Sequence, residues 1–115
     1  MLIRSQNKES LLNTKTISAF NIFESENDFR ISAESLDYSC TIGIYSSRKK
    51  AVKVLDMIQE SYINCTLTEH IIPEIASVVK NMPNTTQNEV LTEIIGNTLS
   101  NKMLFQMPKS SEVEV

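Results

Sequence analysis

A change of hydrophobic period near residue 46 constrains the fold of this chain more than any other feature of its sequence. Before that point apolar residues alternate with small or polar ones, which predicts a strand with one buried face. The residues on the predicted buried side are Tyr38, Cys40, Ile42 and Ile44. After it, apolar residues recur at spacings of three and four, which predicts an amphipathic helix up to Asn64. The residues of this stripe are Ala51, Val54, Leu55, Ile58 and Tyr62, and Ser47 is a suitable N-cap.

The residues before this strand predict further short strands joined by turns. The runs 1–4 and 11–14 are separated by a polar stretch with turn-forming residues, which predicts a hairpin. The run 17–23 is a strand whose alternation slips, so either both of its faces are partly covered or a bulge lies near Ala19–Phe20. The run 29–33 alternates cleanly and follows an acidic turn at 24–28. Short strands with short links favour an antiparallel meander.

The pattern changes from strand to helix between residues 67 and 101. Pro73 suits the first turn of a helix, because its missing N–H is not needed there. Asn81–Pro83 would end that helix, and Thr86 to Glu89 forms a capping box at the start of another. Residues 102–107 predict one more strand, and the tail 110–115 is predicted to lie loose, with pairing at a sheet edge as the alternative.

These elements predict an α+β fold in a single domain of 115 residues. The expected architecture is an antiparallel sheet of about five strands with a packed helix, a helical insertion and a returning C-terminal strand. We expect the core to comprise residues 1–66 and 102–109, the helical insertion residues 67–101, and the acidic tail residues 110–115.

The composition says more about where the protein is expected to be found than about its function. The net charge of −3 gives no general attraction to nucleic acid or to anionic membranes. No apolar run approaches the roughly 20 residues that span a bilayer, and the N-terminus lacks the apolar core of a signal peptide. We therefore expect a cytoplasmic protein without a membrane partner. In that reducing setting Cys40 and Cys65 are expected to be free thiols.

Three stretches of the sequence resemble a group of small uncharacterised proteins of Gram-positive bacteria and their phages. These stretches are Ile3–Lys8, the Gly43–Tyr45 segment leading into Ala51–Gln59, and Phe105–Pro108 before an acidic tail. The resemblance covers residues 1–64 and 102–115, and it departs from the group at Asn7, where aspartate is usual, and at the variable Ile44. It implies the same fold and a bacterial or prophage origin, and it implies no catalytic residue.

The sequence offers little for an enzyme, a metal or another cofactor. The one histidine, His70, and the two cysteines lack the paired spacing of metal ligands. Cys65 is five residues from His70, but closeness in sequence does not make a catalytic pair. With two glycines in the chain there is no glycine-rich phosphate loop. We therefore expect a non-enzymatic protein with no cofactor, no catalytic residue and no metal site.

A basic cluster at the start of the central helix is the candidate site for phosphate or nucleic acid. Its residues are Arg48, Lys49, Lys50 and Lys53. Cations there oppose the helix dipole, yet a helix N-terminus with four cations is competent to bind phosphate. The alternative interpretation is a solvated face with Asp56 or Glu60 as partial partners, and we favour it because no aromatic residues are interleaved to stack bases.

Apolar stripes on the later helices are the candidate association surface. Its residues are Ile75, Val78, Val79, Leu91, Ile94 and Ile95. They either complete the core of the monomer or bind a protein partner or a second copy of the chain, and the sequence favours neither outcome. The functional hypothesis is an interaction or accessory module, self-associating or binding a protein partner. The alternative is a nucleic-acid-binding regulator that uses the basic cluster.

Overall fold

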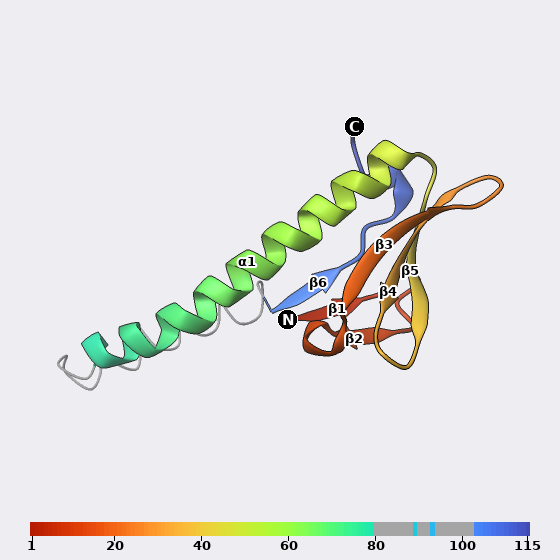
Figure 1. Ribbon diagram of the computed structural model, residues 1–115. Coiled ribbons are helices and arrows are strands. Elements are labelled where there is room, and N and C mark those ends of the chain that lie inside the picture. The colour runs from red at the N-terminus through yellow and green to blue at the C-terminus, as the bar shows by residue number, and fades with distance from the viewer. Residues whose placement is uncertain (80–88, 90–92, 94–102) are drawn as a thin grey trace.

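The two ends of the chain meet in one small sheet. The computed structural model describes residues 1–79, 89, 93 and 103–115. Strands β1 (Leu2–Arg4) and β2 (Leu11–Asn13) form the predicted antiparallel hairpin. Strand β6 (Leu104–Gln106) then pairs with β1 in parallel, which gives the order β2-β1-β6 (Figure 1). Backbone hydrogen bonds extend this pairing, since Leu2 N donates to Met103 O and Met107 N donates to Arg4 O.

The predicted meander forms a second sheet. Strands β3 (Ala19–Glu24), β4 (Phe29–Glu34) and β5 (Ser39–Tyr45) are antiparallel and lie in the order of the sequence. A short 3₁₀ helix, η1 (Thr14–Thr16), links the two sheets along the chain. The α+β class and the meander are therefore confirmed. The strands are divided between two three-stranded sheets, so the C-terminal strand returns to the hairpin rather than to the meander.

A bulge in β5 changes which side of that strand is buried. Ile31 pairs with Gly43 and Ser32 pairs with Thr41, so Ile42 is the extra residue. Beyond the bulge the buried side chain is Tyr45, while Ile44 is 41% exposed, so the prediction that Ile44 is buried was wrong. The register of β3 with β4 is continuous, so no bulge lies at Ala19–Phe20. Both of these residues are half-buried, which fits the alternative of two partly covered faces.

Helix α1 (Arg48–Val79) crosses the meander and contacts β3, β4 and β5. Ser47 caps it as predicted, because Lys50 N donates to Ser47 Oγ at 3.2 Å. The buried face contains Ala51, Val54, Ile58 and Cys65. Leu55, expected in the core, is only half-buried, because it lies at the edge of this face.

The helix does not end near Asn64 or restart at Pro73, so both of these predictions were wrong. α1 is continuous for 32 residues and contains Pro73 in its interior. An interior proline removes one backbone hydrogen bond and crowds the carbonyl of Glu69, at a cost of about 3 kcal/mol. The helix of 32 residues nevertheless stays continuous, so this local cost does not end it. The predicted helix end at Asn81–Pro83 and the capping box at Thr86 lie outside the described residues, of which Glu89 and Glu93 are helical.

The core draws one or more residues from each sheet, from α1 and from the C-terminal segment. Ile3, Ile31, Tyr45, Val54 and Met107 are all at most 1% exposed. The C-terminal tail also contributes, because Val113 is buried and Ser110–Glu112 forms a second 3₁₀ helix, η2. The prediction of a loose tail was therefore wrong.

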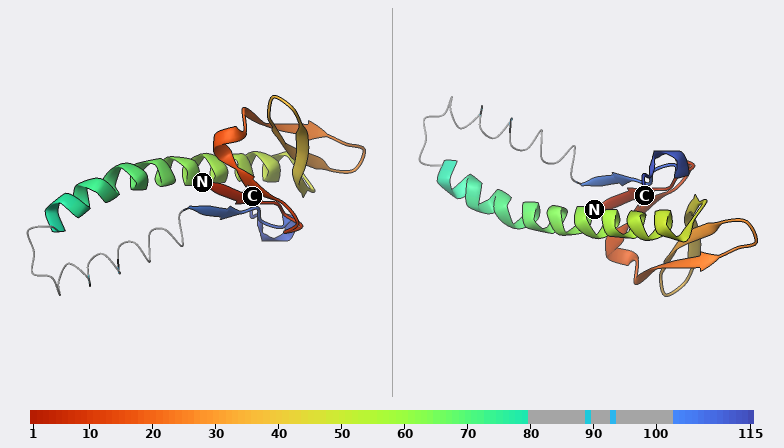
Figure 2. Two further views of the ribbon diagram at one scale, coloured as in Figure 1. Left: turned by 90° about the horizontal axis from the view of Figure 1, so that it is seen from below. Right: turned by 90° about the horizontal axis from the view of Figure 1, so that it is seen from above.

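The second half of α1 extends past both sheets and makes the molecule elongated, with extents of 61 × 32 × 22 Å (Figure 2). We call residues 63–79 of this helix the arm. Within the part of the chain that the structure describes, no helix combines the length and apolarity needed to cross a membrane.

Candidate functional site

The C-terminal tail occupies part of the basic cluster at the start of α1. Lys50 Nζ donates to the carbonyl oxygen of Ser110 at 2.8 Å, and Lys53 Nζ donates to the carbonyl oxygen of Glu114. Ser46 N donates to Ser110 Oγ at 3.1 Å. Two of the four predicted site residues thus hold the tail, and their partners are backbone carbonyls rather than Asp56 or Glu60.

The other two cations of the cluster differ from each other in their surroundings. The guanidinium of Arg48 lies over the ring of Phe29, 5.6 Å from its centroid, in a cation–π contact. Lys49 is exposed. The structure therefore brings the four predicted residues to one end of the helix but directs three of them to intramolecular contacts.

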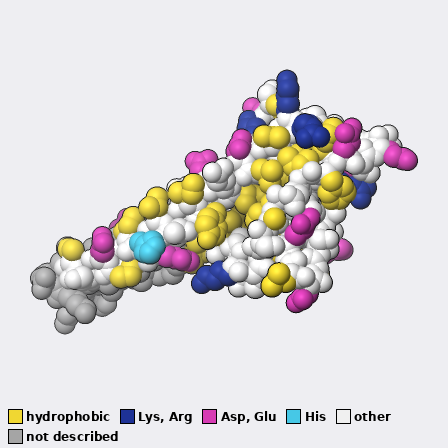
Figure 3. Space-filling view, in the orientation of Figure 1, with side chains coloured by type: hydrophobic (Ala, Val, Ile, Leu, Met, Phe, Trp, Pro, Cys, Tyr) yellow, Lys and Arg dark blue, Asp and Glu magenta, His cyan; other side chains and the backbone are white. Residues whose placement is uncertain are grey.

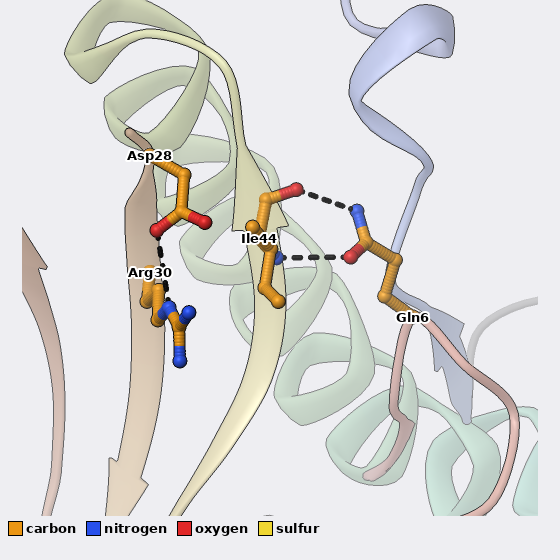
Figure 4. A network of polar contacts seen from close by, with 4 residues as sticks. All are labelled: Gln6, Asp28, Arg30 and Ile44. Atoms are coloured by element: carbon orange, nitrogen blue, oxygen red, sulfur yellow. Dashed lines mark hydrogen bonds and ion pairs between the residues drawn. The ribbon is translucent and has the colours of Figure 1, made fainter. Parts of the chain in front are cut away.

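Gln6 joins three distant segments through one side-chain amide, and Figure 4 shows its two hydrogen bonds to Ile44. Its Oε1 accepts from Ile44 N at 2.9 Å, and its Nε2 donates to Ile44 O at 3.0 Å. Nε2 also donates to Pro108 O at 3.1 Å. The amide pairs with Ile44 as a neighbouring strand would, and so covers part of the β5 edge. Nothing in the local sequence around Gln6 signals this role.

A groove between α1 and the segment leading into β3 has a volume of about 300 Å³. Its lining is mostly apolar and consists of Met1, Thr14, Ile17, Phe20, Leu55, Ile58, Gln59 and Tyr62. The hydroxyl of Thr14 donates to Met1 O at 2.9 Å. None of these described lining residues has a charged side chain, and the Thr14 hydroxyl is engaged in this hydrogen bond.

The reactive side chains named from the sequence do not come together. Cys65 is buried, and its Sγ lies 3.8 Å from Glu69 Oε1 on the same face of α1. His70 is exposed, and five residues along a helix turn it well away from Cys65. Cys40 is half-buried in β5. Among the residues described, no three His, Cys, Asp or Glu side chains gather in a way that would hold a metal ion.

Tyr45 is the described side chain with a clear shift in its pKa. Burial, and secondarily the charge of Glu112, raise the pKa of its hydroxyl far above the ordinary value. The hydroxyl donates to Pro108 O at 2.9 Å. A neutral phenol that donates to a carbonyl within the core stabilises the fold.

The side of α1 opposite its buried face carries a continuous row of exposed residues, which we call the outer face. Successive members are three or four residues apart, with a mean step of about 3.6, so the row stays on one side of the helix throughout. Its members are Lys49, Val52, Asp56, Glu60, Ile63, Leu67, Ile71, Glu74 and Val78, and all of them are exposed. Figure 3 shows hydrophobic side chains spaced along the arm.

The apolar members of the outer face are large and strongly exposed. Ile63 is 49% exposed, Leu67 54%, Ile71 46% and Val78 61%. On the other side of the same helix Cys65 and Thr68 are only 2% and 6% exposed. The helix thus has two apolar sides, of which one is used by the domain and the other faces solvent.

The association surface expected from the sequence overlaps the outer face at one residue, Val78. Ile75 and Val79 lie within α1, but their side chains are outside the described residues, as are Leu91, Ile94 and Ile95. The sequence analysis missed Ile63, Leu67 and Ile71, because it placed a helix end at Asn64. Their spacing of four was the signal that one helix continues through this region.

No protein-family model, curated protein or solved structure matches this chain.

Proposed function

We propose that this protein is a non-enzymatic interaction module that self-associates through the outer face of α1. The observation that carries this proposal is the exposure of Ile63, Leu67 and Ile71 on the side of the helix that the domain does not use. Large aliphatic side chains in a row on a projecting helix are typical of a protein-binding surface rather than of a solvated one.

Self-association is supported by the shape of this surface. The outer face is a row on one side of α1, and the body of the domain lies on the opposite side of that helix (Figure 1). Two copies can therefore approach helix to helix without a collision between their sheets. An isologous contact of this kind uses the same patch on both copies, which is the commonest arrangement in homodimers. Burial of the apolar members would contribute about 25 cal/mol per Å² removed from water.

The test is the mass of the protein in solution, measured by sedimentation equilibrium from micromolar to millimolar concentration. We expect a reversible dimer for the wild type and a monomer for Leu67→Glu, which places a charge in the apolar row. The matched control is Leu36→Glu, because Leu36 is 99% exposed and lies in the turn between β4 and β5, outside α1. The control is expected to remain a dimer. A wild type that stays monomeric throughout this range would refute the proposal.

The second candidate function is nucleic-acid binding by the basic cluster. The observation in its favour is the first turn of α1, which contains cations and no acid. The tail weakens this candidate, since Lys50 and Lys53 already donate to its carbonyls. The test is a DNA or RNA shift assay at several salt concentrations, with Lys49→Gln, Lys50→Gln and Lys53→Gln combined. Absence of binding by the wild type at low salt would rule this function out, because phosphate contacts are strongest there.

A further inference from the structure

We infer that the two copies pair their α1 helices antiparallel, with Lys49 of each copy opposite Glu74 of the other. This inference rests on the proposed self-association and specifies its geometry. The grounds are the distribution of charge along α1 and the symmetry of the outer face.

Charge is segregated along α1. All of its cations lie at the start, at Arg48, Lys49, Lys50 and Lys53, and all of its acids follow, at Asp56, Glu60, Glu69 and Glu74. A parallel pair in register would place the four cations of each copy beside those of the other, and likewise the acids. Like charges held side by side across an interface cost several kcal/mol. An antiparallel pair places the basic start of each helix near the acidic second half of the other, and it also opposes the helix dipoles favourably.

The spacing of the outer face selects a register for that pair. From Lys49 to Glu74 the steps are three, four, four, three, four, four and three, which read the same in both directions. A two-fold axis between Glu60 and Ile63 therefore superposes the row on itself. It brings Lys49 opposite Glu74, Val52 opposite Ile71, Asp56 opposite Leu67 and Glu60 opposite Ile63.

The side chains at these positions suit this register. Val52 and Ile71 are 44% and 46% exposed in the single chain, so their pairing removes apolar surface from water at both ends of the contact. Ile63 and Leu67 lie near the two-fold axis, where they meet the methylene groups of Glu60 and Asp56 of the other copy. Lys49 is the cation of the cluster that belongs to the outer face, whereas Lys50 and Lys53 hold the tail and Arg48 lies over Phe29.

Charge reversal distinguishes this arrangement from a parallel one. Lys49→Glu alone places two acids together at each end of an antiparallel dimer, and Glu74→Lys alone places two lysines together. We expect each variant to raise the dimer Kd about tenfold at low salt, and the difference to shrink at high salt. Both changes in one chain restore an opposite-charge pair, and the Kd should return close to the wild-type value.

A parallel dimer gives a different result. There residue 49 faces residue 49 of the other copy, and residue 74 faces residue 74, so each single variant exchanges one like-charge contact for another and leaves the Kd close to the wild-type value. The matched control is Lys8→Glu, because Lys8 is an exposed lysine in the turn between β1 and β2. Sedimentation equilibrium measures each Kd, and circular dichroism establishes that each variant is folded.

The outcomes separate the two proposals. A dimer whose Kd is unaffected by either single change, or is not restored by the double change, overturns the antiparallel register and leaves the proposed function standing. A wild type that never associates overturns both.

Discussion

Tyr45 occupies the centre of the core because a single extra residue shifts the phase of its strand. With Ile42 bulged out of register, Gly43 and Tyr45 turn to the side that Ile44 would otherwise occupy. A β-carbon on Gly43 would lie 2.8 Å from Tyr45 Cε2 and 3.0 Å from Met107 Cε. Position 43 therefore has no space for a side chain larger than that of glycine.

Replacement of Tyr45 by phenylalanine tests the energetic role of its hydroxyl. At neutral pH the variant loses the hydrogen bond to Pro108 O, at a cost of about 0.5–1.5 kcal/mol. Pro108 O still accepts from Gln6 Nε2, so the carbonyl is not left unpaired. Urea unfolding at neutral pH measures this difference.

We also expect Tyr45→Phe to change the pH dependence of stability. The pKa of Tyr45 is raised in the folded protein, so the folded state keeps the proton at a pH where the unfolded state loses it. Above the unfolded pKa of about 10, the free energy of unfolding of the wild type falls by up to about 1.4 kcal/mol per pH unit from this group. Tyr45→Phe lacks this contribution, so its free energy of unfolding should fall less steeply with pH above about 10. If the free energy of unfolding, measured by urea titration at several pH values, falls equally steeply with pH for both proteins, the raised pKa of Tyr45 is contradicted.

At the scale of elements, α1 combines a packed face and a solvent-facing one in a single helix. The start of the helix also holds the tail, since Lys50 and Lys53 bond to carbonyls of residues 110–115. Four cations near the positive end of a helix dipole are unfavourable, and these carbonyl contacts offset part of that cost.

Two isoleucines on opposite sides of α1 provide a matched test of which side of the helix is packed and which side faces solvent. Ile58 is 4% exposed, and Ile58→Ala is expected to cost about 2–5 kcal/mol through lost burial and the cavity left behind. Ile63 is 49% exposed, and Ile63→Ala should change monomer stability by less than about 0.5 kcal/mol. Denaturant titration at a concentration low enough to keep both variants monomeric measures the two values. Similar losses for both variants would mean that α1 packs on a different side.

At the scale of the whole molecule, the described core lies mainly in residues 1–58 and 103–113, with Cys65 at its far end. The arm contributes little else to this core and carries most of the outer face. Folding and association are therefore expected to separate, with the sheets and the start of α1 forming the domain and the arm forming the contact.

Replacement of residues 70–101 by a Gly/Ser linker tests that separation. Cys65 and Thr68 stay in place, and β6 can still pair with β1. We expect the variant to unfold cooperatively in urea and to be monomeric, because it lacks Ile71 and Glu74. A molten or insoluble product would show instead that the removed segment belongs to the core.

Local chemistry in the sequence determined the α+β class, the hairpin, the meander and the Ser47 cap. Each of these depends on residues within one turn, strand or helical stretch, where alternation and capping act directly. Tertiary structure decided the parallel pairing of β6 with β1, because the paired residues, such as Ile3 and Phe105, are 102 positions apart and no local pattern predicts which strand pairs with which. It also decided the bulge at Ile42, the docked tail and the continuation of α1 through Pro73. In each case a distant contact or a long helix outweighs a local preference of only a few kcal/mol.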